Sequence, residues 1–538
     1  MGMGRGLERL GHDSDHYDYI VLGAGVAGLV AAHRLAAEGR GRILVVDEYD
    51  APGGNQVSRN IGDYSFDIGA FYYPQNAQFF RLFPQCLEPC LSARIPISRV
   101  TPKGQVVGYP VAFRDDLLMR GPWFWARALW SMGQSRLQGR AFASAEDYAR
   151  YYAGDFLYRE LGLQIYMQRF YGVAPSDIDV KFAEARMQAV RRLGSPAEWY
   201  ASGVAKYRKK RSGVARPPQR PPVVRPLEGF GRMYWPAVEQ LQASGVEFRF
   251  GVELRRLTKR REQWHLEAQG CSYRAAALVN TIPVRRISEL LGLSLAQGLH
   301  TSDLQSLYFS FAGDRRFSAA ILYNFSPCGE WKRLTMHSDH YGMRGGRAYF
   351  SVEVPVFKRQ VSAAALAEDF CKSVRRYGLF AGDLELEGDD YLQHAYPALV
   401  RGSHGAVQRA RRALTELGVI SVGRQGYFEY LPTGPQVVAQ VRSLMADALP
   451  SPGQEASGVV SSQSRGLAVV PDPRQVTGSQ VVAPVASQVV TQGALQVVTQ
   501  GALQVVASGE PQVVAPGEPQ VVASGEPQVA PSVVMSSK

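Results

Sequence analysis

The residues best placed to do chemistry are three glycines near the start of the chain, Gly23, Gly25 and Gly28. They lie between a short apolar run at 17–22 and a helix-like apolar run at 29–35. In that setting the first glycine permits a tight turn, the second lets backbone amides approach a pyrophosphate, and the third allows close packing of helix on strand. The positive end of the helix would face the phosphates. The spacing therefore predicts a dinucleotide-binding loop.

An acid and a second glycine pair extend this candidate site. Residues 43–46 form the next apolar run, and Asp47 ends it, nineteen residues after Gly28. A carboxylate at that point can accept hydrogen bonds from a ribose hydroxyl. A glycine pair begins six residues later. The candidate cofactor-binding residues of this half are Gly23, Gly25, Ala27, Gly28, Asp47, Gly53, Gly54 and Asn55.

The stretch 47–55 resembles the second half of the FAD fingerprint of flavin amine oxidases, protoporphyrinogen oxidases and UDP-galactopyranose mutases. The resemblance continues to about residue 448, through a helix entry at 229–236, a strand at 278–283 and a closing segment at 420–430 followed by a helix-like run. It implies FAD as the cofactor and places Leu254, at the end of a strand-like alternation that begins at Val246, near the adenine half. Gly423 and Arg424 belong to the closing FAD motif.

The order of several segments is nearest to the UDP-galactopyranose mutase-like branch. These segments are Gly53–Asn55, Phe170–Pro175, Trp331–Thr335, His394–Pro397 and Gly423–Arg424. The resemblance implies that Arg333 contacts an anionic substrate and that Tyr396 and Tyr430 lie beside the flavin. These three residues are the candidate catalytic residues. Arg186 and Arg191 are expected to add positive charge, with at least one of them simply solvated at the surface.

The chain departs from the mutases at two places that bear on sugar-nucleotide handling. Residues 69–74 carry no histidine where mutases do, and residues 427–433, Tyr-Phe-Glu-Tyr-Leu-Pro-Thr, lose the acid of the Y-x-Y-x-D-M segment that follows the closing arginine in mutases. We therefore expect an FAD-dependent oxidoreductase of the amine-oxidase-like kind, which transfers a hydride from a small-molecule substrate to flavin. A mutase-like isomerase that uses reduced FAD on a nucleotide sugar is the alternative. A non-catalytic FAD-binding protein is a third possibility.

The alternation of apolar runs with amphipathic patterns predicts an α/β protein with a Rossmann-like FAD-binding domain built from discontinuous segments. A substrate or helical domain is inserted in it, and a repeat tail follows it. The expected parts are 1–16 (flexible N-terminus), 17–100, 226–290 and 411–448 (FAD-binding domain), 101–225 (mainly helical cap), 291–410 (substrate domain) and 449–538 (tail). In the tail, Gln-Val recurs every eight residues from Gln480 to Gln528, with too few apolar residues per repeat to form a core, so we expect disorder.

Composition narrows the class further. The net charge of +12 is spread along the chain rather than concentrated, which gives no argument for nucleic acid as a partner. The five cysteines are an odd number and mostly far apart, which indicates reduced thiols and no metal site. No run of eighteen apolar residues is present, and the first residues lack a secretory signal, so we expect a cytoplasmic protein without a membrane span. The oligomeric state cannot be inferred from the sequence.

Overall fold

The computed structural model describes residues 16–69, 71–111, 121–137, 139, 142–195, 198, 220–357 and 361–449. The octapeptide repeats and the segment before residue 16 lie outside these residues, as do Lys206–Arg211. The disorder that we expect for the tail therefore stays a prediction.

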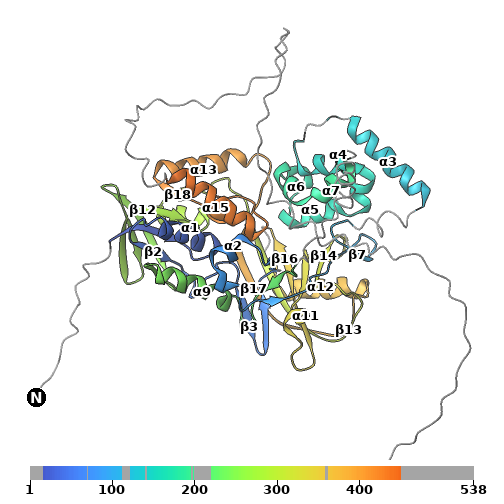
Figure 1. Cartoon of the computed structure of the whole chain (residues 1–538). Helices are drawn as coiled ribbons and strands as arrows, with labels where there is room; N and C mark the ends of the chain where they lie inside the picture. Colours follow the sequence, from blue (N-terminus) through green and yellow to red (C-terminus); the bar gives the residue numbers. More distant parts are fainter. Residues whose placement is uncertain are drawn as a thin grey trace, which may run out of the picture. The chain divides into compact units, whose positions relative to one another are not determined.

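The first sheet is the predicted Rossmann-like sheet. Its parallel part has the order β18-β12-β1-β2-β9, and β10 and β11 extend it in antiparallel fashion beside β12 (Figure 1). The strands are β1 (His16–Leu22), β2 (Ile43–Val46), β9 (Val246–Arg249), β10 (Leu254–Arg260), β11 (Gln263–Ala268), β12 (Cys271–Asn280) and β18 (Val419–Ser421). The parallel pairing of β1 with β12 and of β12 with β18 brings residues from three distant parts of the chain to one sheet edge.

Helices cover both faces of the parallel part of this sheet, which explains why β2 is apolar and buried throughout. Along β1, Val21 belongs to the core beneath one set of helices, whereas Ile20 and Leu22 belong to the core on the other face. The helices around the sheet are α1 (Val26–Ala37), α2 (Gln78–Leu82), α9 (Phe230–Ala243), α10 (Val284–Leu291), α13 (His404–Glu416), α14 (Gly423–Gly426) and α15 (Gly434–Ala448).

A second sheet is mainly antiparallel, with the strand order β17-β13-β16-β15-β14-β6-β7. Its strands are β6 (Ile97–Val100), β7 (Val106–Gly108), β13 (Thr301–Arg315), β14 (Ile321–Asn324), β15 (Arg333–Met336), β16 (Ala348–Val356) and β17 (Phe380–Pro397). Helix α12 (Ala363–Arg376) packs Phe370 and Val374 into the core of this sheet, and α11 (Ser338–Tyr341) follows β15. The region expected as a substrate domain is thus a sheet with a helix packed on it, and residues 97–108 also contribute to it.

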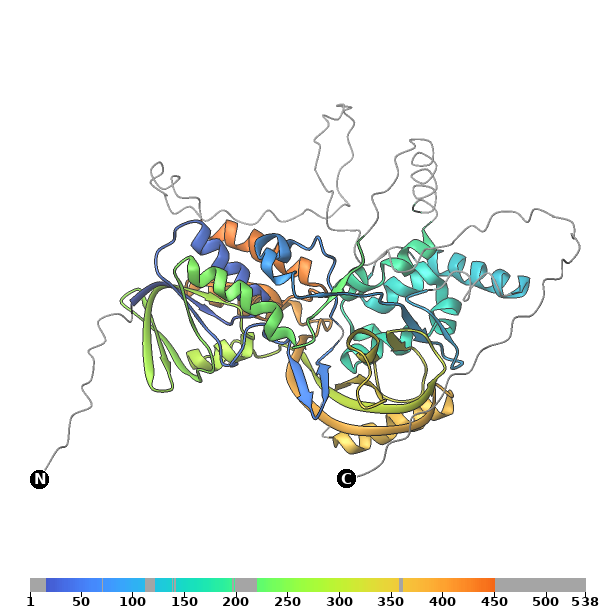
Figure 2. The ribbon, with the colours of Figure 1, turned by 60° about the horizontal axis from the view of Figure 1, so that its bottom comes forward.

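A helical layer follows β7 and carries its own aromatic core (Figure 2). Its helices are α3 (Pro122–Leu137), α4 (Ala145–Glu160), α5 (Leu163–Tyr171), α6 (Val180–Arg186) and α7 (Gln188–Gly194). Ser144 caps α4 in a capping box with Asp147, and Asp179 caps α6, so both helices begin where their side chains accept backbone hydrogen bonds.

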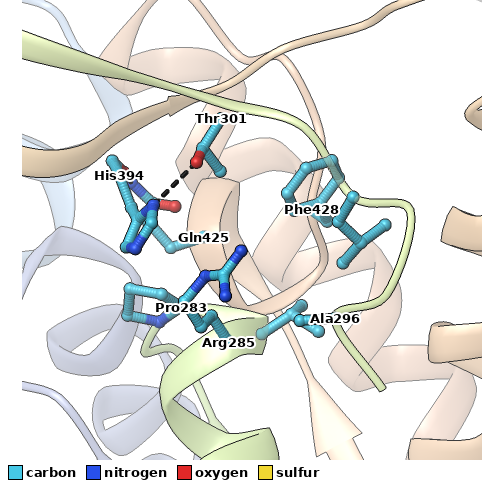
Figure 3. A pocket seen from close by; sticks show the side chains of 9 residues that line it. Pro283, Arg285, Ala296, Thr301, His394, Gln425 and Phe428 are labelled. Carbon is cyan, nitrogen blue, oxygen red and sulfur yellow. Dashed lines mark hydrogen bonds between the residues drawn. The ribbon is translucent and has the colours of Figure 1, made fainter. Parts of the chain in front are cut away.

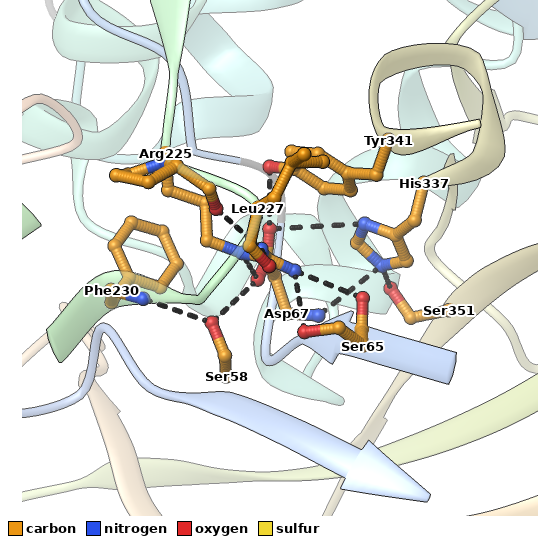
Figure 4. Close-up of polar contacts among 10 residues, drawn as sticks. Ser58, Ser65, Asp67, Arg225, Leu227, Phe230, His337, Tyr341 and Ser351 are labelled. Carbon is orange, nitrogen blue, oxygen red and sulfur yellow. Dashed lines mark hydrogen bonds and ion pairs between the residues drawn. The ribbon is translucent and has the colours of Figure 1, made fainter. Parts of the chain in front are cut away.

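Two short ladders complete the fold: β3 (Ser58–Ile61) with β4 (Tyr64–Asp67), and β5 (Leu91–Ser92) with β8 (Val223–Val224). A buried ion pair connects them, since Arg225 Nε lies 2.5 Å from Asp67 Oδ1 (Figure 4). Arg225 Nη2 also donates to the Ser65 carbonyl at 2.9 Å, and Tyr341 Oη donates to Asp67 Oδ2 at 3.2 Å. Ser58 Oγ accepts a hydrogen bond from the first amide of α9, Phe230 N, at 3.1 Å, which ties the β3–β4 hairpin to the Rossmann domain.

Candidate active site

The glycine loop between β1 and α1 has the tight turn and the close helix packing that its spacing predicts, whereas the approach of a pyrophosphate to Gly25 stays a prediction. A Cβ added at Gly28 would lie 1.8 Å from the Gly23 carbonyl oxygen, so helix and turn pack as closely as glycine permits. Gly23 has a φ of +98°, which favours glycine. A Cβ at Gly25 would meet nothing closer than 3.6 Å. A side-chain atom there would therefore make only ordinary van der Waals contact with the backbone of Gly53 and Gly54.

The start of α1 is free to bind an anion. Its N-cap, Gly25, supplies no side-chain hydrogen bond, and its first turn contains no acidic residue. The first amides of a helix have no partner inside the helix. Together with the missing side chain at Gly25, these amides fit a pyrophosphate group.

Asp47 lies at the predicted place, at the end of β2, but its carboxylate already accepts hydrogen bonds from the chain. Its Oδ2 accepts from Ala24 N at 2.5 Å and its Oδ1 from Tyr49 N at 2.9 Å. Burial raises the pKa of Asp47, against these two backbone hydrogen bonds. The carboxylate thus holds the glycine loop in place, and its contact with a ribose stays a prediction.

Glu48, which sequence reasoning did not select, lies next to this acid and connects it to Leu254. It accepts a hydrogen bond from Leu254 N at 3.3 Å and forms an ion pair with Arg286 of α10. The backbone of Leu254 thus lies beside the end of β2. The signal that points to Glu48 is its place directly after Asp47 at the end of the strand.

The second glycine pair contacts the first glycine loop. Gly53 N donates to the Ala24 carbonyl at 3.1 Å, and a Cβ at Gly54 would lie 3.3 Å from Gly25 Cα. Asn55 follows and is partly buried. The two halves of the amino-terminal motif therefore form one surface.

The closing motif reaches the same place from the other end of the folded chain. Gly423 has a φ of +81°, and a Cβ there would lie 2.5 Å from Ala27 Cβ in α1. Gly423 N donates to Gln440 Oε1 at 2.8 Å, and Arg424 Nε donates to the Leu431 carbonyl at 2.8 Å. The structure brings the predicted cofactor residues of both ends together, whereas their contact with FAD stays a prediction.

A pocket beside this motif involves residues that sequence reasoning did not select (Figure 3). Gln425 and Phe428 line it from the closing motif, and Pro283 and Arg285 line it from the start of α10. Thr301 Oγ1 and His394 Nδ1 lie 2.7 Å apart at its edge. The Gln425 amide donates to the His394 carbonyl at 3.0 Å, so this pocket joins the closing motif to the second sheet.

Arg333 lies in a buried cluster of charges on the second sheet. It faces Glu353 across the β15–β16 ladder and forms an ion pair with it. Lys332 Nζ lies 2.8 Å from the other carboxylate oxygen of Glu353, and Arg333 Nη1 donates to Tyr323 Oη at 3.4 Å. Burial raises the pKa of Glu353, but the charges of Arg333 and Lys332 outweigh it and lower the pKa to about 2. Glu353 is therefore ionised, and it holds both cations.

Arg186 joins the aromatic side of this cluster from α6. Its guanidinium lies 4.9 Å from the Phe170 ring, and its charge acts on the hydroxyl groups of Tyr323 and Tyr430. Its buried Nε has no hydrogen-bond partner among the residues that the structure describes. Arg191, by contrast, pairs with Glu198 at 2.8 Å and is partly exposed. Of the two arginines, Arg186 is the one in the candidate site.

The three residues expected to be catalytic converge on this region. Lys332 Nζ lies 5.0 Å from the Tyr396 ring, and Tyr430 packs 5.7 Å from Phe182 of α6. Burial raises the pKa of Tyr430. For Tyr323 burial also acts to raise the pKa, but the charges of Arg333 and Arg186 outweigh it and lower the pKa. Tyr323 is a further candidate that the sequence did not reveal.

The comparisons with known proteins concern the first βαβ unit and the fold of the chain. Residues 21–86 match the family described as the NAD(P)-binding Rossmann-like domain. Prolycopene isomerase 2 of an Oncidium hybrid cultivar is 41% identical over 58 residues, 11% of this chain and 10% of that protein's length. The matched segment thus spans only a tenth of that relative.

Three solved structures share the fold over most of the chain. Reduced UDP-galactopyranose mutase has a TM-score of 0.65 at 18% identity, covering 80% of this chain and 93% of the other. A putative protoporphyrinogen oxidase from Exiguobacterium sp. 255-15 has a TM-score of 0.59 at 15% identity, with 81% and 99% coverage. A putrescine oxidase variant has a TM-score of 0.53 at 13% identity, with 80% and 98% coverage.

Residues 21–86 thus match an NAD(P)-binding Rossmann-like domain, and most of the chain shares its fold with these three structures. The glycine loop and Asp47 fall inside the matched segment 21–86, whereas Arg333 and Arg186 lie outside it. In the part of the chain that the structure describes, no helix is long and apolar enough to cross a membrane. The same residues contain no cluster of metal-binding side chains.

Proposed function

We propose that this protein binds FAD and is an FAD-dependent oxidoreductase whose small-molecule substrate carries an anionic group. The observation that carries the proposal is the joining of Gly25, Gly54 and Gly423 around the uncapped start of α1. FAD bound there would accept a hydride from the substrate, or in its reduced form would act as a nucleophile in a mutase.

Different residues of the chain bind different parts of this cofactor. The first amides of α1 bind the pyrophosphate, because the helix start has no side-chain cap and no acidic residue in its first turn. Asp47 and Glu48 lie where the ribose would bind, and Leu254 lies beside them for the adenine half. Arg424, whose side chain is held by the Leu431 carbonyl, contributes positive charge at the closing motif.

The charged cluster binds the substrate. Arg333 is held by Glu353, and Arg186 has its guanidinium beside aromatic rings; the Nε of each arginine has no hydrogen-bond partner among the described residues. Charge-assisted hydrogen bonds from such groups are the stronger class, and a guanidinium can bind an oxyanion in bidentate fashion. Tyr323, with its lowered pKa, is placed between the two arginines to donate or accept a hydrogen bond at the substrate.

A mutase-like isomerase that acts on a nucleotide sugar is the second candidate, and one observation favours it. Two arginines from different elements, Arg186 and Arg333, act on the same tyrosine, Tyr323, which suits a diphosphate with two charged groups. Residues 69–74 contain no histidine, and the only acid in 427–433 is Glu429, which does not stand where the mutase segment carries its acid; both departures favour the oxidoreductase instead.

The cofactor is tested by the visible spectrum and the FAD content of the purified protein. We expect a yellow protein with close to one FAD per chain. Gly25→Val should remove the FAD while leaving the fold intact, because the first atom of the new side chain meets no protein atom within 3.5 Å. Gly133→Val, at a helical glycine with no atom within 4 Å of a Cβ, is the matched control and should keep its FAD. Full FAD retention by Gly25→Val would refute the assignment.

The reaction class is tested by the need for an electron acceptor. An oxidoreductase consumes an acceptor such as oxygen with every turnover, whereas a mutase, once reduced, interconverts the ring forms of UDP-galactose without further reductant. Arg333→Ala should weaken binding of the anionic substrate by about 1.5–3 kcal/mol while FAD stays bound. Ring interconversion by the reduced enzyme, lost in this variant, would replace the oxidoreductase by the mutase.

A further inference from the structure

Helix α3 presents large apolar side chains that are exposed among the residues that the structure describes. The exposed fractions of Trp123, Trp130 and Leu137 are 83%, 71% and 89%, and that of Leu129 is 62%. Elsewhere among the described residues, the exposed large apolar side chains are more scattered and mostly less exposed. Scattered exposed apolar residues are normal, but a group of them on one helix marks an interaction surface.

Three of these side chains share one side of the helix, and Leu129 lies beside that side. Trp123, Trp130 and Leu137 follow one another at intervals of seven residues, which is two helical turns. The opposite side is anchored, since Ala128 is fully buried in the core of the helical layer and the Phe124 ring lies 5.1 Å from that of Phe156 in α4. In both views α3 lies at the outer edge of the helical layer (Figures 1 and 2).

The positive charges of α3 indicate what kind of surface it binds. The helix carries Arg127 and Arg136 and no acidic residue. Arg127 is exposed and lies 4.7 Å from the Phe156 ring, and Arg136 donates to the Gly194 carbonyl. No carboxylate of the described residues forms an ion pair with either arginine. If two copies of α3 packed face to face, their positively charged arginines would lie close together and repel each other. An anionic surface would attract them.

We propose that the exposed side of α3, formed by Trp123, Leu129, Trp130 and Leu137 with Arg127, docks this protein onto the surface of an anionic lipid bilayer. Tryptophan prefers the interface between lipid and water, and helices with aromatic and aliphatic residues on one side and arginine beside them lie in that interface. The helix has only sixteen residues and two charges, so it lies on the bilayer and does not cross it.

Docking through α3 places the candidate substrate site near the lipid. Helix α3 packs on α4, and α4 also contacts α6, which carries Arg186. The helical layer thus links the lipid-facing residues to the cluster that binds the anionic group. The docking surface itself does not depend on the cofactor or on the reaction class.

Flotation of the full-length protein with vesicles tests the proposal. We expect binding to vesicles of phosphatidylcholine with phosphatidylglycerol, weaker binding to phosphatidylcholine alone, and a decrease as salt is raised. The double substitution Trp123→Gln with Trp130→Gln should weaken binding by at least about tenfold, because two large side chains lose their apolar burial. The matched control replaces Leu293 and Met343, which are exposed on other elements, by Gln and should bind like the unchanged protein.

Two further measurements make the outcome decisive. Brominated lipids should quench part of the tryptophan fluorescence of the unchanged protein, and less of it in the double variant, while the melting temperature of both stays the same. Absence of vesicle binding would overturn the proposal. So would equal binding by the double variant, or a concentration-dependent dimer in light scattering that the double variant abolishes, since that would make a second copy the partner.

Discussion

Replacing Glu353 by glutamine removes the single carboxylate that holds Lys332 and Arg333 in the second sheet. The side chain of Glu353 is 1% exposed. Its carboxylate lies 2.8 Å from Lys332 Nζ and forms an ion pair with Arg333. Glutamine keeps the size and one hydrogen-bonding oxygen, but it loses the charge. Glu353→Gln would leave two cations close together in the protein interior without a counter-ion.

The size of the effect follows from the pKa of the carboxyl group. The folded protein lowers the pKa of Glu353 from 4.5 to about 2, because the two cations outweigh burial. A difference of about 2.5 in pKa corresponds to about 3 kcal/mol of stabilisation. Since the folded pKa is below that of the unfolded chain, this stabilisation is present above pH 4.5 and is lost as the pH falls towards 2. We therefore expect Glu353→Gln to lower the free energy of unfolding by about 3 kcal/mol at pH 7.

Urea unfolding at pH 7 and at pH 3 measures this difference. The gap between the variant and the unchanged protein should shrink at pH 3, because part of the contribution of Glu353 is already lost there. Glu368→Gln serves as the control, since Glu368 pairs with Lys372 at 2.6 Å on the exposed side of α12, where such pairs contribute little. Equal stability of Glu353→Gln and the unchanged protein at pH 7, or a gap that does not change with pH, would refute this reasoning.

Three other predictions follow from the described contacts. Gly28→Ala should lower the melting temperature and remove FAD together, unlike Gly25→Val, because its Cβ would lie 1.8 Å from the Gly23 carbonyl oxygen; a normal melting temperature would contradict this. Burial and the charge of Arg225 lower the pKa of His337 well below its usual range, so the unfolded chain binds a proton that the folded chain does not below about pH 6.5. The free energy of unfolding should therefore fall by up to about 1.4 kcal/mol per pH unit below that point, and His337→Asn should flatten the profile measured by urea unfolding. Deleting residues 455–538 should leave FAD content and melting temperature unchanged in absorbance and calorimetry, because the cofactor motifs end before residue 449; a large loss would show that the repeats pack.

The Rossmann domain could be predicted from the sequence because its signals are local. The apolar run at 17–22, the three glycines and Asp47 lie within one βαβ unit, and each residue acts on neighbours a short distance along the chain. The strand expected from Val246 to Leu254 is interrupted, however. It is β9, parallel to β2, followed by β10, antiparallel to β11. An alternating pattern shows that a segment is extended, but it does not show that its pairing partner changes on the way.

The charged cluster could be predicted only in part, because it depends on cross-strand register. Arg333 was expected from the resemblance, but its partner Glu353 lies twenty residues away and faces it only through the β15–β16 ladder. A signal was present: Glu353 is the one acid in the apolar run 349–356, and a carboxylate in such a run needs a buried cation. Arg186 gave a weaker signal, since its sequence distance to Arg191 does not show which of them points inward.

The two candidate sites are joined by a short piece of chain, and this constrains how substrate and cofactor meet. A Cβ at Gly69 would lie 3.1 Å from Glu353 Oε1 and 3.3 Å from Arg333 Nη2, so this residue contacts the charged cluster. Four residues later, Tyr73 Oη lies 3.0 Å from Tyr234 Oη, and the Tyr234 ring lies 3.0 Å from the place of a Cβ at Gly53. A movement of the glycine pair Gly53–Gly54 would therefore be transmitted to Arg333 through the segment from Gly69 to Tyr73. Where mutases carry a histidine in the same segment, this chain uses tyrosine and phenylalanine, so any difference in chemistry between the two begins at the link between the sites.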